Sequence, residues 1–169
     1  MEHHEIERKF LVAPADLPAD LSPYEAHAIT QGYLCTKPTV RVRKENDSYY
    51  LTYKGAPAED GLDREEYNLP LTKAAYETLL SKCDGTVISK TRYHIPLAGS
   101  GCAACGRDLM IELDVFHAPF EGLFYAEVEF EDTAAAKAFV PPAWFGREVT
   151  DDKRFSNAAL SRSGTIPEM

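Results

Sequence analysis

The stretch Glu5-Ile6-Glu7-Arg8-Lys9 decides how this chain is expected to fold. Its residues alternate as in a β-strand, where successive side chains point to opposite faces, so Glu5, Glu7 and Lys9 share one face. Two carboxylates and an ammonium on one face are costly to bury. The pattern therefore indicates a wet polar cavity, in which the carboxylates bind a hard cation and the lysine meets an anion.

The length of 169 residues suits one domain, residues 1–169, with a sizeable core. The net charge of -9, from 27 acidic and 18 basic residues, argues against general nucleic-acid binding. It leaves room for a local basic cluster that binds a small anion. The chain has no apolar run long enough to span a membrane and no signal-peptide pattern at its N-terminus. We therefore expect a cytoplasmic location and no membrane partner.

Eight segments alternate like strands, and residues at helical spacing lie between and after them. The expected strands are residues 5–10, 26–34, 39–44, 48–54, 63–69, 86–95, 108–116 and 123–131. Asn46-Asp47 is a turn signal that predicts a hairpin between the third and fourth strands. Helices are expected from the N-cap Thr72 to about Cys83, where Gly85 stops the first, from Thr133 to Phe139, and through Asn157 to Leu160.

Charged residues recur on one face of most of these strands. A β-sandwich with charged outer faces would explain any single strand, but a solvated face usually mixes Ser, Thr and Gln with its charges. The pattern favours an α+β, mainly β fold: an eight-stranded antiparallel closed barrel (a tunnel) lined by charge, with helices packed outside and a C-terminal helix. The expected lining residues are Lys9, Arg41, Arg43, Lys54, Arg64, Lys90 and Arg92, and Glu5, Glu7, Glu66, Glu112, Asp114, Glu127 and Glu129.

The two signs in this lining indicate complementary chemistry. Paired arginines suit the planar, multidentate recognition of phosphate oxygens. Clustered carboxylates suit Mg²⁺ or Mn²⁺, which prefer oxygen ligands and often bridge to substrate phosphates. Arginines and carboxylates in one cavity predict that the cavity binds a polyanion together with a divalent metal ion. Such a site supports the cleavage of a phosphoanhydride bond.

The charged blocks, taken in order, resemble the triphosphate tunnel metalloenzymes, also called the CYTH superfamily, over nearly the whole chain. The first strand carries the Glu-x-Glu-x-Lys signature of that family. The blocks that follow are Gln31-Gly32-Tyr33-Leu34, Arg41-Val42-Arg43, Lys54, residues 64–67, Lys90 with Arg92, Glu112-Leu113-Asp114, Glu127-Val128-Glu129, and a tail with Trp144, Gly146, Glu148-Val149-Thr150 and Asn157. The tail resembles the closing motif of the short bacterial members, and the ordered set is more specific than the signature alone.

The resemblance implies a tunnel that binds triphosphate end to end with Mg²⁺ or Mn²⁺. The implied metal ligands are Glu5, Glu7 and Glu129, with Glu127 and Asp114 near a second metal or the attacking water and Glu112 beside them. The implied phosphate-binding residues are Lys9, Arg41, Arg43, Lys54, Arg64 and Arg92. Lys90 would assist at the scissile phosphate, Arg154 would reach in from the C-terminal helix, and Tyr33 would lie in the tunnel wall.

The substrate implied by the resemblance is inorganic tripolyphosphate, converted to diphosphate and phosphate. The family also includes thiamine triphosphatases, RNA 5′-triphosphatases and class IV adenylate cyclases, so a cyclase or a thiamine or nucleoside triphosphatase stays open. A polyphosphate-binding module is the non-enzymatic alternative, although binding alone would need the cations more than the carboxylates. A homodimer is left open. Cys102 and Cys105 are expected to be two thiols in a surface hairpin, because a structural zinc site would want four ligands.

Overall fold

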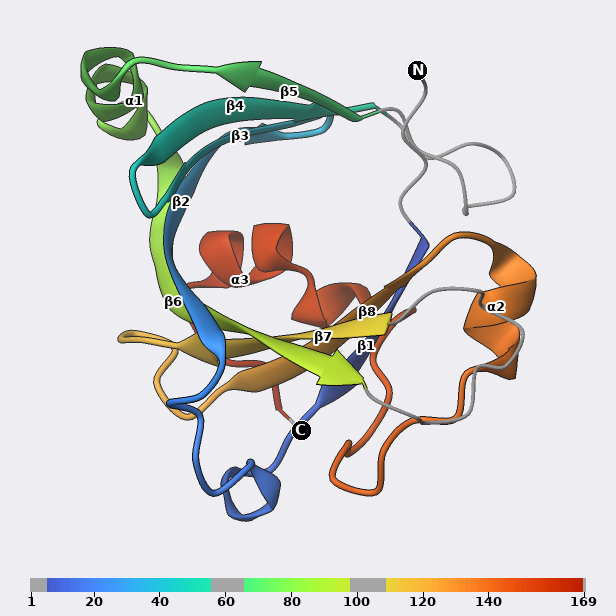
Figure 1. Cartoon of the computed structure of the whole chain (residues 1–169). Helices are drawn as coiled ribbons and strands as arrows, with labels where there is room; N and C mark the ends of the chain where they lie inside the picture. Colours follow the sequence, from blue (N-terminus) through green and yellow to red (C-terminus); the bar gives the residue numbers. More distant parts are fainter. Residues whose placement is uncertain (1–5, 56–65, 98–108, 169) are drawn as a thin grey trace.

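Eight antiparallel strands form one strongly curved sheet in the computed structural model of the chain, which describes residues 6–55, 66–97 and 109–168 (Figure 1). The strands are β1 (Ile6–Leu11), β2 (Glu25–Thr36), β3 (Thr39–Glu45), β4 (Ser48–Lys54), β5 (Glu66–Pro70), β6 (Asp84–Leu97), β7 (Leu109–Phe116) and β8 (Phe124–Phe130). The helices are η1 (Pro14–Asp16), α1 (Lys73–Leu80), α2 (Thr133–Ala138), η2 (Lys153–Phe155) and α3 (Asn157–Ser163). The predicted strands are therefore confirmed, apart from small shifts at their ends and the stretch before Glu66 that lies outside the described residues.

The predicted turn between β3 and β4 is confirmed. Asn46 has a positive φ of 49°, which the short polar side chain of asparagine tolerates. Its backbone N–H donates to the carbonyl of Ala28, and its side-chain oxygen accepts from the Ala28 N–H. The turn is thereby tied to β2, which fixes the register of the hairpin against the neighbouring strand.

The predicted start of α1 is confirmed, but its end is not. The Thr72 side chain accepts a hydrogen bond from the Ala75 N–H, as an N-cap does. The helix ends at Leu80, and Gly85, expected to stop it, lies inside β6 with a φ of +76°. A Cβ at Gly85 would come within 2.5 Å of the Ser161 carbonyl oxygen, so this glycine is explained by the close approach of α3.

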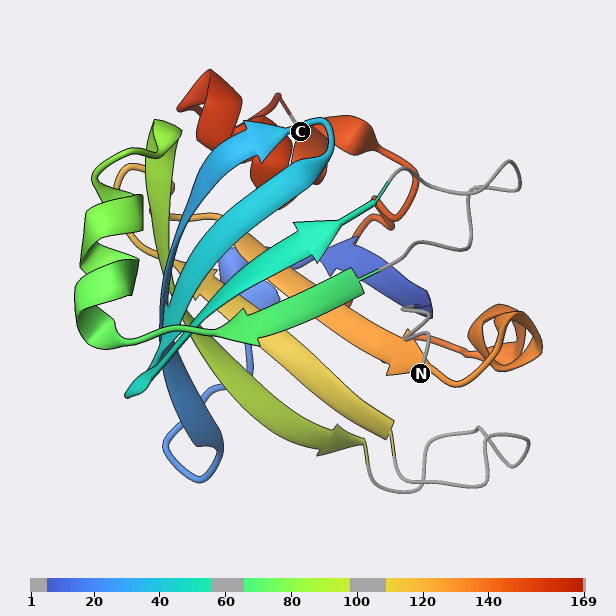
Figure 2. The same cartoon turned by 90° about the horizontal axis from the view of Figure 1, so that it is seen from above.

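The prediction of a closed barrel is wrong. The strand order is β1-β8-β7-β6-β2-β3-β4-β5, and within the described ranges no ladder joins β1 to β5 (Figures 1 and 2). The free edge of β1 is instead taken by the chain after α2: Val149 N–H donates to the Lys9 carbonyl, and Leu11 exchanges backbone hydrogen bonds with Gly146 and Arg147. The sheet is open because a C-terminal segment occupies the edge that closure would need.

Two apolar clusters lie on opposite faces of the curved sheet. One covers the outer face beside α2 and includes Phe10, Val128, Phe130 and Phe139. The other lies on the inner face under η2 and α3, where Phe155 and Leu160 pack with Tyr33, Ile88, Phe116 and Tyr125. In Figure 1, α3 lies within the curve of the sheet. Because η2 and α3 cover part of the inner face, only the rest of that face is left for charged side chains.

No described helix is both long enough and apolar enough to cross a membrane.

Candidate active site on the inner face of the sheet

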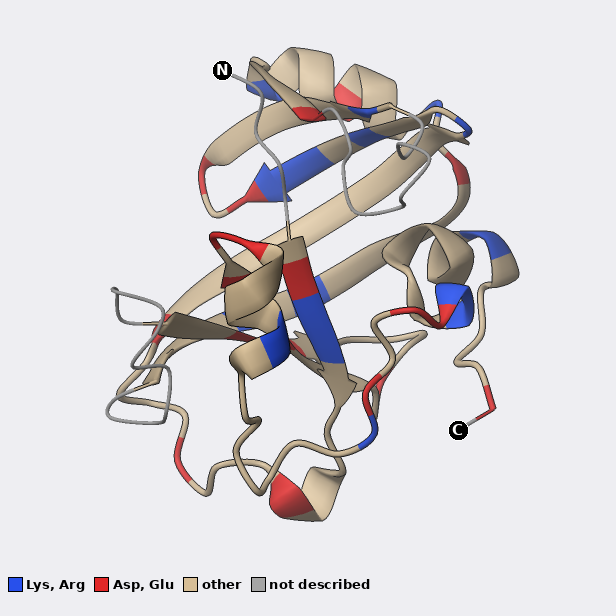
Figure 3. Cartoon of the chain, turned by 90° about the vertical axis from the view of Figure 1, so that its right-hand side faces the viewer, with Lys and Arg blue, Asp and Glu red and all other residues tan. Residues whose placement is uncertain are grey.

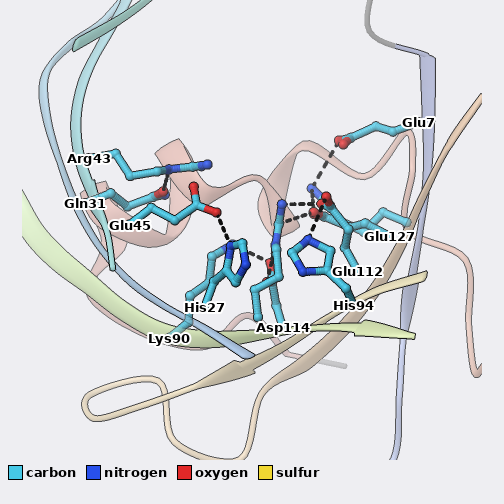
Figure 4. A network of polar contacts seen from close by, with 12 residues as sticks. Glu7, His27, Gln31, Arg43, Glu45, Lys90, His94, Glu112, Asp114 and Glu127 are labelled. Carbon is cyan, nitrogen blue, oxygen red and sulfur yellow. Dashed lines mark hydrogen bonds and ion pairs between the residues drawn. The ribbon is translucent and has the colours of Figure 1, made fainter. Parts of the chain in front are cut away.

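Strand register brings the charged residues of several strands to one inner face. Residues directly opposite in an antiparallel pair point the same way. The opposed pairs include Lys9 with Glu127, Gln31 with Arg43, Arg92 with Asp114 and Glu112 with Glu127. Figure 3 shows the adjacent negative and positive positions of β1. In Figure 4, Arg43 and Gln31 point inward from one wall, Glu7 and Glu127 from the opposite wall, and Lys90 lies between them.

Arg41 and Arg43 form a cationic pair on β3. The Arg43 guanidinium donates to Gln31 Oε1 at 2.9 Å and to the Tyr50 hydroxyl at 3.5 Å. Arg41 donates to Thr52 Oγ1 at 3.2 Å, and its buried Nε has no hydrogen-bond partner among the described residues. Burial and the neighbouring Arg43 charge lower the pKa of Arg41. In the part of the chain that the structure describes, neither guanidinium pairs with a carboxylate, so the pair suits an incoming anion.

Arg92 is held on the opposite side by three carboxylates. Its guanidinium contacts both oxygens of Asp114, at 2.7 and 2.8 Å, and Glu127 Oε2 at 2.7 Å. It also donates to Glu112. Burial acts to lower the pKa of Arg92, but the three carboxylates outweigh it and raise the pKa well above its ordinary value. Arg92 is therefore a permanently charged, rigidly held group.

Lys9 belongs to the same network. Its ammonium lies 3.0 Å from Glu127 Oε1 and 3.6 Å from Glu7 Oε1. Burial acts against the charged ammonium, but Glu127 and Glu7 outweigh it and raise the pKa of Lys9. Glu127 responds in the opposite direction: burial acts to raise its pKa, and Lys9 and Arg92 bring it well below the ordinary range. Both groups are therefore ionised at neutral pH.

Lys90 is the one fully buried lysine among the described residues. Its ammonium donates to Asp114, the carboxylate that also holds Arg92. Burial lowers the pKa of Lys90 to about 8, and the nearby Arg92 acts in the same direction, although Asp114 opposes both. Asp114 is pulled the other way, since Arg92 and Lys90 outweigh its burial and lower its pKa. Lys90 can therefore exchange a proton near physiological pH.

The expected metal ligands fall into two groups. Glu7 and Glu129 lie directly opposite each other on β1 and β8. Carboxylates placed this way offer the oxygen donors that Mg²⁺ and Mn²⁺ prefer, so this pair fits such an ion. Glu112, Asp114 and Glu127 already bind Arg92, and the last two also bind lysines. These three residues, like Glu7 with its contact to Lys9, would have to exchange contacts in order to bind a metal.

Of the remaining predicted site residues, two are linked to the inner face, one is not, and the others lie outside the described residues. The Lys54 ammonium pairs with Glu66 at 2.8 Å, and the buried Tyr33 hydroxyl accepts from Gln31 Nε2 at 3.3 Å, so both are linked to the inner face. Arg154 lies in η2 and not in α3; its side chain is 57% exposed and pairs with Asp152 at 2.7 Å, so it is not brought to the network. Glu5, Arg64, Cys102 and Cys105 lie outside the described residues.

Sequence reasoning did not assign the residues that position the arginines or the histidines nearby. The two β3 arginines are held by Gln31, Tyr50 and Thr52. Each of these three residues shares a strand face with a predicted site residue, and that alternation could have identified them. His27 carried no comparable signal, because β2 pairs with β6, which lies far away in the sequence. Only the strand order places this histidine beside Arg92 and close to His94.

Comparison with known proteins adds three findings. The sequence profile described as the CYTH domain matches residues 3–156. An inorganic triphosphatase of Nitrosomonas europaea is 42% identical over 94% of this chain and 97% of its own length, and one of Acetivibrio thermocellus is 36% identical over 94% of each chain. A crystal structure described as an inorganic triphosphatase superposes with a TM-score of 0.68 at 36% identity, covering 98% of each chain.

Proposed function

The chain belongs to the CYTH domain family, and on this premise we propose that it hydrolyses inorganic triphosphate on the charged inner face of its curved sheet. The two relatives and the solved structure described as inorganic triphosphatases match over nearly their whole lengths, which supports the same reaction here. In this reaction water attacks a terminal phosphorus, one P–O–P bond breaks, and diphosphate and phosphate leave.

The observation that carries the proposal is the Arg41–Arg43 pair. Two neighbouring guanidiniums, one of them 8% exposed with a buried Nε that lacks a partner, are costly unless an anion balances them. A triphosphate offers several charged oxygens along one chain and can contact both. Gln31 and Tyr50 hold Arg43 in place, so its fork is positioned before the anion arrives.

The other charged residues take roles according to where they lie. We assign Lys9, Lys54 and Arg92 to phosphate oxygens, and Lys90, held by Asp114, to the developing charge at the scissile phosphate. Glu7 and Glu129 would hold Mg²⁺ or Mn²⁺, with Glu5 as a predicted third ligand. A bound divalent ion would neutralise phosphate charge and activate the reacting groups. The cytoplasmic location and a homodimer stay predictions.

Phosphate release from a panel of substrates tests the proposed function. The panel is tripolyphosphate, ATP and thiamine triphosphate, each with Mg²⁺, with Mn²⁺ and with a chelator. We expect metal-dependent release that favours tripolyphosphate and stops with the chelator. Conversion of ATP into pyrophosphate and cyclic AMP would replace the proposal with a cyclase. Tight binding of tripolyphosphate without turnover would leave a polyphosphate-binding module.

The pH dependence of the reaction provides a prediction about Lys90. Because its pKa is lowered to about 8, the ammonium loses its proton as pH rises through that value. We expect kcat/KM for tripolyphosphate, which reports the free enzyme, to fall above about pH 8. A Lys90→Arg variant keeps its charge across this range, so its profile should lack the fall near pH 8, whatever its absolute rate. An unchanged basic limb in that variant would show that another group titrates.

A further inference from the structure

Two histidines and a glutamate lie together at the end of the inner face that is distant from α3. Glu25 and His27 belong to the start of β2, and His94 lies opposite Glu25 on β6. One ligand atom from each residue lies within 4.8 Å of the other two. His27 Nε2 is 3.0 Å from Glu25 Oε1, and the two imidazole ring centres are 4.6 Å apart. Figure 4 shows His27 beside Glu45 and His94 beside Glu112.

The two imidazole rings have the kind of surroundings that metal-binding histidines have: a carboxylate orients one ring, and the other ring has a nitrogen without a hydrogen-bond partner in the described part of the chain. His27 Nδ1 lies 2.6 Å from Glu45 Oε1, a contact that orients the ring, and a metal would take the position between Nε2 and the Glu25 carboxylate. Glu45 is itself held by the Tyr50 hydroxyl at 2.6 Å. His94 Nε2 lies 3.7 Å from Glu112, and its buried Nδ1 has no hydrogen-bond partner among the described residues. An imidazole nitrogen without a hydrogen-bond partner can donate its electron pair to a metal ion.

The charge around the two rings favours a cation. Three carboxylates, Glu25, Glu45 and Glu112, contact the histidines. Arg92 also binds Glu112, but most of its contacts go to Asp114 and Glu127. Without a metal, the hydrogen bonds to Glu25 and Glu45 raise the pKa of His27, which favours a positive charge on this ring. A divalent ion would supply a positive charge at the same place.

We propose that Glu25, His27 and His94 bind a divalent transition metal of the Zn²⁺ class, with Glu45 orienting His27. Two imidazoles and one carboxylate suit Zn²⁺, Co²⁺ or Ni²⁺ better than Mg²⁺, which prefers oxygen. The side chain of Glu25 is 73% exposed and is free to turn the short distance that ligation requires. This ion is distinct from the one assigned to Glu7 and Glu129, and three protein ligands leave it an open position.

Titration of the chain with Co²⁺ in the absence of triphosphate tests this site, because visible absorption reports nitrogen ligation directly. The variants are His27→Gln, His94→Gln and Glu25→Gln, and the matched control is His117→Gln, an exposed histidine that contacts Thr91. We expect the wild type and the control to bind one more equivalent than the two histidine variants. Glu45→Gln should weaken that equivalent about 10- to 100-fold. Thermal midpoints establish that each variant is folded.

If a histidine variant fails to fold, Glu25→Gln still tests the site, because residue 25 is exposed. This variant should bind the extra equivalent of Co²⁺ more weakly than the wild type does. Equal stoichiometry and identical spectra in the wild type and all of these variants would overturn the proposed site. A Glu7→Gln variant should keep the extra equivalent, because Glu7 belongs to the other ion. The readout is binding of the metal alone, so its outcome is independent of whether the chain hydrolyses triphosphate.

Discussion

An Asp114→Asn variant is expected to lose about 3–5 kcal/mol of unfolding free energy, the typical cost of breaking a buried ion pair. Asp114 is completely buried and holds both Lys90 and Arg92. An asparagine of the same size would leave two buried cations facing a neutral amide. Lys90 can shed its proton to limit the loss, whereas Arg92 cannot.

Urea unfolding at neutral pH measures this loss, with Asp151→Asn as the matched control. Asp151 is exposed, so its variant should stay within about 0.5 kcal/mol of the wild type. If Asp114→Asn unfolds at the same urea concentration and with the same slope as the wild type, the buried ion network does not contribute as described.

Removal of either arginine of the β3 pair is expected to cost roughly 100- to 1,000-fold in kcat/KM for tripolyphosphate, the usual effect of deleting one charge-stabilising donor. Arg41→Ala and Arg43→Ala each delete a fork that contacts phosphate in the proposed complex. They also relieve the repulsion between two neighbouring cations, so the free protein should lose less stability than activity. The double variant is expected to lose less than the product of the two single effects, because the residues act together.

Steady-state phosphate release measures these losses, and Arg162→Ala is the control. Arg162 lies in α3 and is exposed, so its variant should retain the wild-type rate. Arg43→Lys should recover only part of the activity, since a lysine keeps the charge but not the fork. Activity of Arg41→Ala and Arg43→Ala equal to the wild type would exclude the β3 pair from the substrate site.

The sequence was a good guide to the strands and to the charged faces. Alternation in steps of two predicted that Lys90 and Arg92 share one face; Arg92 lies directly opposite Asp114 in the ladder, and the Lys90 ammonium donates to the same carboxylate. The side chains on each strand follow from local geometry, which is why this part was predictable.

Features that depend on distant parts of the chain were not predictable. The sheet stays open because Gly146, Arg147 and Val149 take the edge of β1, a contact that no local pattern encodes. The proposed site of Glu25, His27 and His94 depends on the pairing of β2 with β6. This pairing brings His27 close to His94, although the two residues are far apart in the sequence. The buried Ile29 also interrupts the polar face of β2. The alternation of polar and apolar residues in β2 therefore did not predict that His27 belongs to a polar site.

A divalent ion on the inner face is proposed to support the hydrolysis of triphosphate. The role of this ion is tested most directly by measuring phosphate release from tripolyphosphate over a range of Mg²⁺ or Mn²⁺ concentrations. The proteins compared are the wild type, Glu7→Gln and the control Glu77→Gln, which changes an exposed residue of α1. We predict that Glu7→Gln loses roughly 100-fold or more at every metal concentration while Glu77→Gln follows the wild type. Release by Glu7→Gln at the wild-type rate and with the same metal dependence would contradict the account.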